Sequence, residues 1–143
     1  MLHGCGTALV TPFARDESID EGALRKLVAW QIAEGIDFLV PCGTTGEAVT
    51  MSAEERARLV QIVVKESNGR VPVVAGATSN DTRAAVDEAK RMRDAGADYI
   101  LSATPYYNKP TQEGFYQHYK AIAEDVGIPI CVYNIPGRTG KNI

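Results

Sequence analysis

Tyr133 and Arg138 lie close together in the stretch Tyr133–Gly140, which follows an apolar run. A phenol can donate and accept a proton, and a guanidinium can bind a carboxylate through two parallel hydrogen bonds. By residue type alone, a tyrosine in this position is as typical of the core or its margin as of a catalytic site. The pair indicates proton transfer on a carboxylate-bearing substrate, provided that other segments bring matching groups beside it.

The turn Cys42–Glu47 follows another apolar run and contains Gly43, Thr44 and Thr45. Glycines on both sides of the two threonines allow a tight turn whose backbone amides point outward, a geometry that can bind a carboxylate or a phosphate. An ordinary connection from strand to helix, in which the hydroxyls cap nearby amides, fits the same residues. Both interpretations of the turn stay open.

A third polar segment, Pro105–Pro110, contains the adjacent phenols Tyr106 and Tyr107. Its two prolines restrict the conformation of the loop. Because adjacent side chains do not face the same way, one phenol can serve a site while the other packs against a neighbour or a partner subunit. Plain packing of both rings is the alternative.

Composition narrows the function classes. The chain has 143 residues, of which 45% are hydrophobic, and a net charge of -3, which argues against a nucleic-acid-binding surface. No apolar run approaches the roughly 20 residues that cross a membrane. The N-terminus has neither a basic region nor a small-residue cleavage site, so we expect a cytoplasmic protein without membrane contact.

The motif inventory points away from bound metals and cofactors. Metal-ligand spacings and the GxGxxG, P-loop and GxSxG patterns are absent from the sequence, so neither a metal ion nor a cofactor is expected. Cys5, Cys42 and Cys131 are odd in number and widely spaced, which predicts buried, reduced thiols. The polar inventory therefore lacks an obvious nucleophile.

Short apolar runs alternate with segments of helical period along the whole chain, which predicts five parallel strands and four helices. Ser52 and Glu55 form the pattern of a capping box at the start of the second helix, and Thr111 is the expected N-cap of the fourth. The expected strands are Thr7–Val10, Ile36–Pro41, Val71–Ala75, Asp98–Ala103 and Ile128–Tyr133.

A weak internal repeat favours a barrel. Gly35–Val40 resembles Gly96–Leu101, and Val71–Val74 resembles Ile128–Val132, so alternate strands are alike. In a (β/α)8 TIM barrel alternate strands supply alternate layers of the interior; an open doubly wound sheet is the alternative. Because such a barrel needs about 250 residues, we expect residues 1–143 to be the N-terminal portion of a single barrel domain that is incomplete at its C-terminus, with open apolar strand edges.

Taken together, four segments resemble the dihydrodipicolinate synthase family, also called the 4-hydroxy-tetrahydrodipicolinate synthase family. The resemblance runs from Gly6 to the last residue and implies a TIM barrel that condenses pyruvate with aspartate semialdehyde on the diaminopimelate route to lysine. The four segments are Gly6–Phe13, Gly43–Glu47, Pro105–Pro110 with Glu113 and Gly114, and Tyr133–Gly140.

The resemblance also implies catalytic roles. Thr44, Tyr107 and Tyr133 match a proton relay in which Tyr133 is the main acid and base. Tyr107 matches a residue that reaches into the site of a neighbouring subunit, which implies a homodimer, usually within a homotetramer.

Substrate binding is implied in the same way. Gly43 and Thr45 match the turn that holds the pyruvate carboxylate, and Arg138 matches the residue that orients the carboxylate of the semialdehyde. The family forms a Schiff base between pyruvate and a lysine on the sixth strand, a position beyond Ile143. The chain alone is therefore expected to be inactive.

Several alternatives remain beside the synthase. N-acetylneuraminate lyases and 2-keto-3-deoxy sugar-acid aldolases share the barrel and the lysine, but Thr44, Thr45 and Arg138 favour the synthase. A barrel that binds a keto acid without catalysis would lack the lysine. An inactive fragment is the remaining alternative.

One departure from the family pattern concerns regulation. The resemblance implies that family members inhibited by lysine carry a carboxylate where this chain has Ala84 and an imidazole where it has Arg56. The neighbouring asparagine and tyrosine of those members match Asn80 and Tyr106. Without the carboxylate, the ammonium of an effector lysine loses its ionic partner. Weak or absent feedback inhibition is expected.

Overall fold

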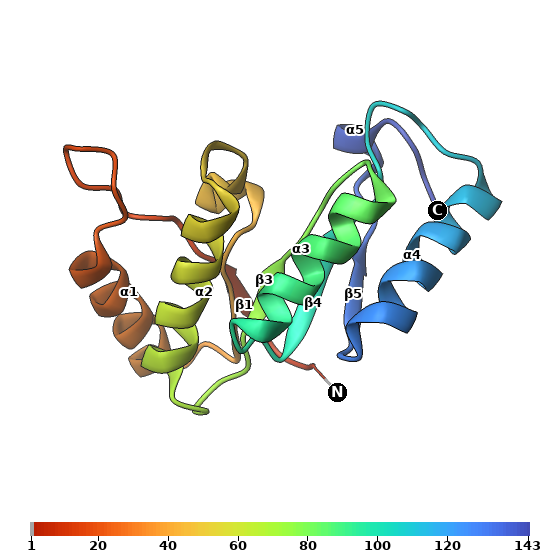
Figure 1. Cartoon of the computed structure of the whole chain (residues 1–143). Helices are drawn as coiled ribbons and strands as arrows, with labels where there is room; N and C mark the ends of the chain where they lie inside the picture. Colours follow the sequence, from red (N-terminus) through yellow and green to blue (C-terminus); the bar gives the residue numbers. More distant parts are fainter. Residues whose placement is uncertain (1) are drawn as a thin grey trace.

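Residues 2–143 are described by a computed structural model in which five strands and four long helices alternate (Figure 1). The strands are β1 (Gly6–Ala8), β2 (Phe38–Val40), β3 (Val74–Gly76), β4 (Tyr99–Ala103) and β5 (Ile130–Tyr133). The long helices are α1 (Glu21–Ala33), α2 (Ala53–Ser67), α3 (Thr82–Asp94) and α4 (Gln112–Val126). The predicted alternation of strands and helices is confirmed.

Three short elements were not predicted: the helix α5 (Pro136–Thr139) and the 3-10 turns η1 (Thr44–Gly46) and η2 (Ala48–Thr50). Each is too short to carry an apolar stripe of helical period, which is the signal that reveals a helix in a sequence. All three lie in the polar segments that follow β2 and β5. The candidate site is therefore built largely from short elements that hydrophobic periodicity does not predict.

The strands are parallel and follow one another in chain order. β1 pairs with β2, β3 pairs with β4, and β4 pairs with β5. A single parallel bridge from Leu39 to Val73 joins the two groups. A doubly wound sheet reverses its strand order at a switch point, whereas Figure 1 shows α1 to α4 standing in a row along one side of the strands. The arrangement is that of consecutive units of a (β/α)8 barrel, and the doubly wound alternative is wrong.

The core lies between the strands and the helices. Leu39, Ala75 and Ile100 are completely buried and pack in one apolar cluster with Val63 of α2 and Ile122 of α4. Because successive side chains of a strand point to opposite faces, these residues mark the helix-facing side of each strand. Burying a side chain of this size stabilises a fold by about 1.5–3 kcal/mol. The helices are thus held against the strands, and the strand ends keep a fixed spacing.

The helix starts agree with the sequence prediction. The Ser52 hydroxyl accepts a hydrogen bond from the Glu55 amide, and the Glu55 carboxylate accepts one from the Ser52 amide, at 3.2 and 2.7 Å. The Thr111 hydroxyl accepts from the Gly114 amide at 3.1 Å. Such caps satisfy first-turn amides that have no partner within the helix. Among residues 2–143, no helix has the length and apolar character needed to cross a bilayer.

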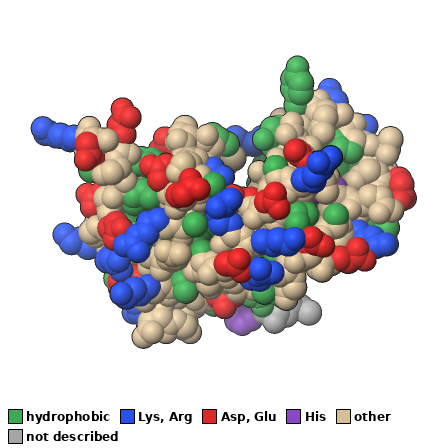
Figure 2. All heavy atoms as spheres, in the orientation of Figure 1, with side chains coloured by type: hydrophobic (Ala, Val, Ile, Leu, Met, Phe, Trp, Pro, Cys, Tyr) green, Lys and Arg blue, Asp and Glu red, His purple; other side chains and the backbone are tan. Residues whose placement is uncertain are grey.

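Charges of both signs alternate over the outer face of the molecule. Figure 2 shows Lys and Arg side chains interspersed with Asp and Glu across α1, α2 and α3. Arg58 approaches Glu21 at 2.7 Å, and Arg56 approaches Glu88 at 2.6 Å. The hydrogen bond from Arg58 holds the pKa of the Glu21 carboxyl below its ordinary value. This face has no extended region of a single charge.

Candidate active site

The predicted site residues all follow the carboxyl ends of strands. Thr44 and Thr45 lie in η1 after β2, Tyr107 lies in the loop after β4, and Tyr133 ends β5 three residues before α5. Arg138 belongs to α5. Because the strands are parallel and adjacent, their carboxyl ends form one end of the layer, where barrel enzymes carry their active sites.

The turn after β2 is held tightly by the backbone. The Gly46 amide donates to the Gly43 carbonyl and the Glu47 amide donates to the Thr44 carbonyl, both at 3.1 Å. Thr44 and Thr45 are exposed, and in the described part of the chain neither hydroxyl caps this turn. The structure thus gives no support to the interpretation of these hydroxyls as local caps.

Gly76 at the end of β3 contributes to the same turn, a role that the sequence interpretation missed. A Cβ atom at Gly76 would lie 2.1 Å from the carbonyl oxygen of Cys42, so only glycine lets the two backbones approach this closely. Cys42 itself adopts a left-handed φ of 58°. A lone glycine inside an apolar run is the available sequence signal, since it marks a close backbone approach.

The loop after β4 presents Tyr107 to the outside. Tyr107 adopts a left-handed φ of 67° and its side chain is 90% exposed. The Asn80 amide donates to the Tyr106 carbonyl at 3.3 Å, and the Asn108 amide donates to the Asn80 carbonyl at 3.0 Å. Asn80 therefore connects the loop to the start of α3, while the phenol of Tyr107 extends away from its own chain.

Tyr133 and Arg138 occupy the last strand and the short helix after it. The Tyr133 carbonyl accepts a hydrogen bond from the Thr104 amide at 3.1 Å, and the Tyr133 side chain is 43% exposed. Pro136 starts α5, and Gly140 ends it with a left-handed φ of 73°. Arg138 is exposed and forms no ion pair with any residue of the described chain.

The structure brings the β4 and β5 segments together directly, whereas the three proposed relay hydroxyls are not joined. A Cβ atom at Gly140 would lie 3.2 Å from the Lys109 side chain, so the tyrosine loop runs beside the end of α5. Within residues 2–143, no hydrogen bond links the hydroxyls of Thr44, Tyr107 and Tyr133 to one another.

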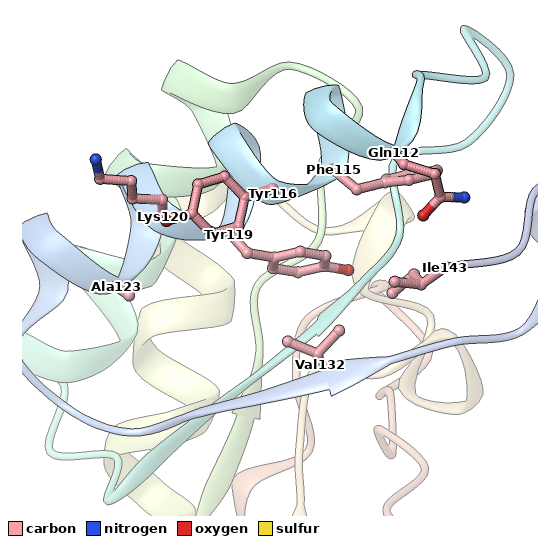
Figure 3. Close-up of a pocket in the computed structure, with 8 residues that line it drawn as sticks. All are labelled: Gln112, Phe115, Tyr116, Tyr119, Lys120, Ala123, Val132 and Ile143. Atoms are coloured by element: carbon pink, nitrogen blue, oxygen red, sulfur yellow. The ribbon is translucent and has the colours of Figure 1, made fainter.

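A groove also lies on the outer side of β5. It has a volume of about 590 Å³ and is shown in Figure 3, where Val132 faces Phe115 and Tyr119 of α4, with Ile143 at one end. Because Val132 and Tyr133 are successive strand residues, their side chains point to opposite faces. The groove is therefore separate from the candidate site.

Among residues 2–143, the cysteines and the helical lysines do not supply a nucleophile at this end of the strands. Burial raises the pKa of the Cys42 thiol to about 12, so the thiol is protonated at neutral pH. Cys131 is partly buried, but Cys5 is exposed, which corrects the expectation that all three are buried. Cys5 lies directly before β1. The helical lysines are Lys26, Lys65, Lys90 and Lys120, and the loop lysines are Lys109 and Lys141.

Parallel strands in chain order, helices along one side and polar groups at the carboxyl ends define a protein of the (β/α)8-barrel class. Comparison with known proteins makes this class specific. The chain belongs to the dihydrodipicolinate synthetase family, whose sequence profile matches residues 1–143. The family resemblance noted in the sequence is confirmed.

Individual relatives agree on the family. The chain is 60% identical over 143 residues to the 4-hydroxy-tetrahydrodipicolinate synthase of Koribacter versatilis, covering 99% of this chain and 48% of that protein. It is 48% identical to the chloride-inhibited dihydrodipicolinate synthase from Acinetobacter baumannii complexed with pyruvate, with a TM-score of 0.96 over 99% of this chain and 49% of that one. For the enzyme from Cyanidioschyzon merolae with lysine bound, the identity is 40% and the TM-score 0.92, over 96% of this chain and 47% of that one.

The chain thus spans about half the length of the relatives it matches, with 48% of the Koribacter versatilis protein covered. Over that half, its fold superposes on the crystal structures almost completely, at TM-scores of 0.96 and 0.92. The prediction of a TIM barrel represented by about its first five strands and four helices is confirmed.

Proposed function

We propose that the protein to which this chain belongs condenses pyruvate with aspartate semialdehyde to give 4-hydroxy-tetrahydrodipicolinate, in the cytoplasm. One observation carries the proposal. A two-threonine turn, an exposed phenol and a guanidinium that has no ion pair among residues 2–143 follow the strands at one end of the layer, in a chain 60% identical to a synthase. The chain would be the N-terminal portion of a single barrel domain.

Gly43, Thr45 and Arg138 would bind the two carboxylates. Gly43 is extended, with φ -76° and ψ 178°, and leads into η1, whose first amides have no partner within the turn. Amides and hydroxyls in this arrangement suit the small carboxylate of pyruvate. The guanidinium of Arg138 suits the carboxylate of the semialdehyde, because it can make two parallel hydrogen bonds.

Proton transfer would run through Tyr133, Thr44 and Tyr107. The Tyr133 phenol would exchange a proton with the reacting carbonyl and amine, and the Thr44 hydroxyl would pass it on. Tyr107 is 90% exposed, so it is available to a second copy of the chain rather than to its own site. The proposal therefore includes a homodimer, within a homotetramer, whose sites share Tyr107.

Carbon–carbon bond formation would use a lysine on the strand after β5. Its neutral amine adds to the ketone of pyruvate, and loss of water leaves an iminium. Loss of a methyl proton from the iminium gives an enamine, whose carbon attacks the aldehyde of the semialdehyde. The lysine–pyruvate imine is the electron sink, so no separate cofactor is required.

A fused barrel tests the proposal. The chain is joined at Ile143 to the C-terminal half of the Koribacter versatilis synthase, beginning at the residue that aligns after Ile143. We expect the fusion to consume both substrates and the 143-residue chain alone to consume neither. Pyruvate with borohydride should add one adduct to a single lysine of the fusion, measured by intact mass.

The outcomes separate the alternatives. A folded fusion that forms the adduct but leaves aspartate semialdehyde unchanged would point to an aldolase for another aldehyde, such as a neuraminate lyase or a sugar-acid aldolase. A folded fusion that binds pyruvate without an adduct would point to a non-catalytic barrel. Circular dichroism and gel filtration of the unmodified Koribacter versatilis enzyme provide the reference for folding.

A further inference from the structure

We propose that Thr11 is a positioning residue that holds the turn Gly43–Gly46 in place through its side-chain hydroxyl. This proposal rests on the proposed function, because it names that turn as the pyruvate-binding turn. The Thr11 hydroxyl donates to the Gly46 carbonyl at 2.6 Å, and Thr11 is only 5% exposed. A short bond in a buried setting is worth more than one at the surface.

Steric contact acts at the same point as the hydrogen bond. A Cβ atom at Gly46 would lie 2.8 Å from the Leu9 carbonyl oxygen and 3.2 Å from the Thr11 hydroxyl. The segment that follows β1 is itself fixed, since the Leu9 amide donates to the Val40 carbonyl at 3.0 Å. The backbone after β1 is therefore in direct contact with the turn after β2. Because the Leu9–Val40 bond holds the β1 side, loss of the Thr11 bond would loosen only the turn.

Thr11 lies outside the turn Gly43–Gly46 and donates a side-chain hydrogen bond to it. In the described chain, the other hydrogen bonds of Gly43–Gly46 are the two backbone bonds within η1 and its C-cap. The next segment is held by a different residue, because the Arg56 guanidinium donates to the carbonyls of Met51 and Ala48 at 2.6 and 3.3 Å. Loss of the Thr11 hydroxyl should thus free the first half of the segment and leave the second in place.

The consequence for chemistry follows from the position of Thr44 and Thr45. Both lie between the two glycines, so a shift of Gly46 moves their amides and hydroxyls together. Misplacing a binding group by about 1 Å can cost about a hundredfold in rate. Thr11 would act through these two residues without touching either substrate.

The first experiment measures local order in the fused barrel. Hydrogen exchange by mass spectrometry follows peptides over Gly43–Glu47 in the wild type, Thr11→Val and Thr11→Ser. Valine keeps the shape and removes the hydroxyl, and serine restores the hydroxyl. We expect exchange of the turn to rise about three- to tenfold in Thr11→Val, as the loss of one hydrogen bond implies, and to return within about twofold of wild type in Thr11→Ser.

Thr7→Val is the matched control. The Thr7 hydroxyl donates to the Gln31 side chain of α1 at 2.7 Å, so this variant removes a hydroxyl from the same segment without touching the turn. Exchange over Gly43–Glu47 should not change in it. If hydrogen exchange in Thr11→Val rises equally in the turn and in the β3–β4 pair, the variant is generally unfolded and the positioning role is wrong. The positioning role is also wrong if exchange of the turn does not change in Thr11→Val.

The second experiment measures catalysis in the fused barrel. Thr11→Val should raise the KM for pyruvate about tenfold while kcat changes less, and Thr11→Ser should recover both. If the fusion condenses its substrates but Thr11→Val leaves the pyruvate KM unchanged, the positioning role is wrong and the proposed function stands. If the fusion is inactive but the turn still loosens in Thr11→Val and recovers in Thr11→Ser, the structural role stands and the proposed function fails.

Discussion

Two loops at the same end of the strands differ in how they are held. The turn Gly43–Glu47 is fixed by Thr11 from the β1 side and by the close approach of Gly76 from β3. The loop that carries Tyr107 is connected to the rest of the chain by Asn80, and its phenol is 90% exposed. A group that must bind a substrate within its own barrel needs a fixed backbone, whereas a group that serves a partner must extend from its own surface.

We expect the largest effect from replacing Tyr133, whose phenol would exchange protons with groups of both loops. Tyr133→Phe in the fused barrel should lower kcat by about 10²–10⁴, the range for loss of a general acid or base. The melting temperature should change little, because the side chain is 43% exposed. Steady-state kinetics and a thermal melt measure the two quantities. Tyr116→Phe, on α4 and 61% exposed, is the control and should keep full activity, because Tyr116 lines the groove on the outer side of β5 and not the candidate site.

Mixing two inactive variants tests whether Tyr107 acts on a partner. Tyr107→Phe and Tyr133→Phe each remove one hydroxyl, and a dimer of one of each rebuilds one complete site when Tyr107 acts in trans. Random pairing should restore activity to about a quarter of the sites. Turnover of the mixture after subunit exchange measures this. Recovery no greater than the sum of the two variants would place Tyr107 in its own subunit's site, and the contrast between the loops would disappear.

Acid should weaken the contact between α3 and α4 and so lower the stability of the fold. His118 is 3% exposed, its Nδ1 lies 2.9 Å from the Thr82 hydroxyl at the start of α3, and burial lowers the pKa of its imidazole. The unfolded chain therefore takes up the proton more readily, so this contribution to stability is present above the unfolded pKa of about 6.5 and is lost as the pH falls through the lower folded pKa.

Urea unfolding of the wild type and of His118→Gln, at about pH 7.5 and about pH 5.5, measures the effect of acid on stability. The wild type should lose more stability between the two conditions than the variant does. Equal losses would show that other groups account for the acid sensitivity.

Free lysine, added as a feedback effector, should have the smallest effect of all on the rate. Arg56 is engaged by Glu88 at 2.6 Å and by two carbonyls, and Ala84 lies one turn before Glu88 on α3 without a charge to offer an ammonium group. We expect a lysine titration of the fused barrel to change its rate by less than about twofold, because the ion pair that would hold the effector is missing. Strong inhibition would show that the remaining Asn80 and Tyr106 are sufficient for the effector.

Local sequence patterns predicted the helices and strands well and their boundaries less well. The capping residues Ser52 and Thr111 were found because a cap is defined by residues three positions apart. The strand Val71–Ala75 was predicted too early, because β3 begins at Val74 and the buried residue before it, Val73, forms only an isolated bridge to Leu39. Burial and strand pairing give the same signal in a sequence.

The candidate site was predictable as a set of residue types but not as an arrangement. Tyr133, Arg138 and the threonine turn stand out because polar groups follow apolar runs, and the family resemblance assigned them roles. Thr11 did not stand out, because its bond to Gly46 spans 35 residues of sequence. A hydroxyl at the end of a strand looks the same whether it faces solvent or supports a site.

The sequence by itself determined the alternation of strands and helices, the helix starts and the family, because each depends on neighbouring residues or on a conserved order of short segments. Only the tertiary structure decided that the strands follow chain order with the helices on one side, and that Tyr107 extends away from its chain. It also decided that Thr11 and Gly76 enclose the turn after β2. These features depend on contacts between residues that folding brings together, and a local pattern cannot encode which distant backbone will lie beside it.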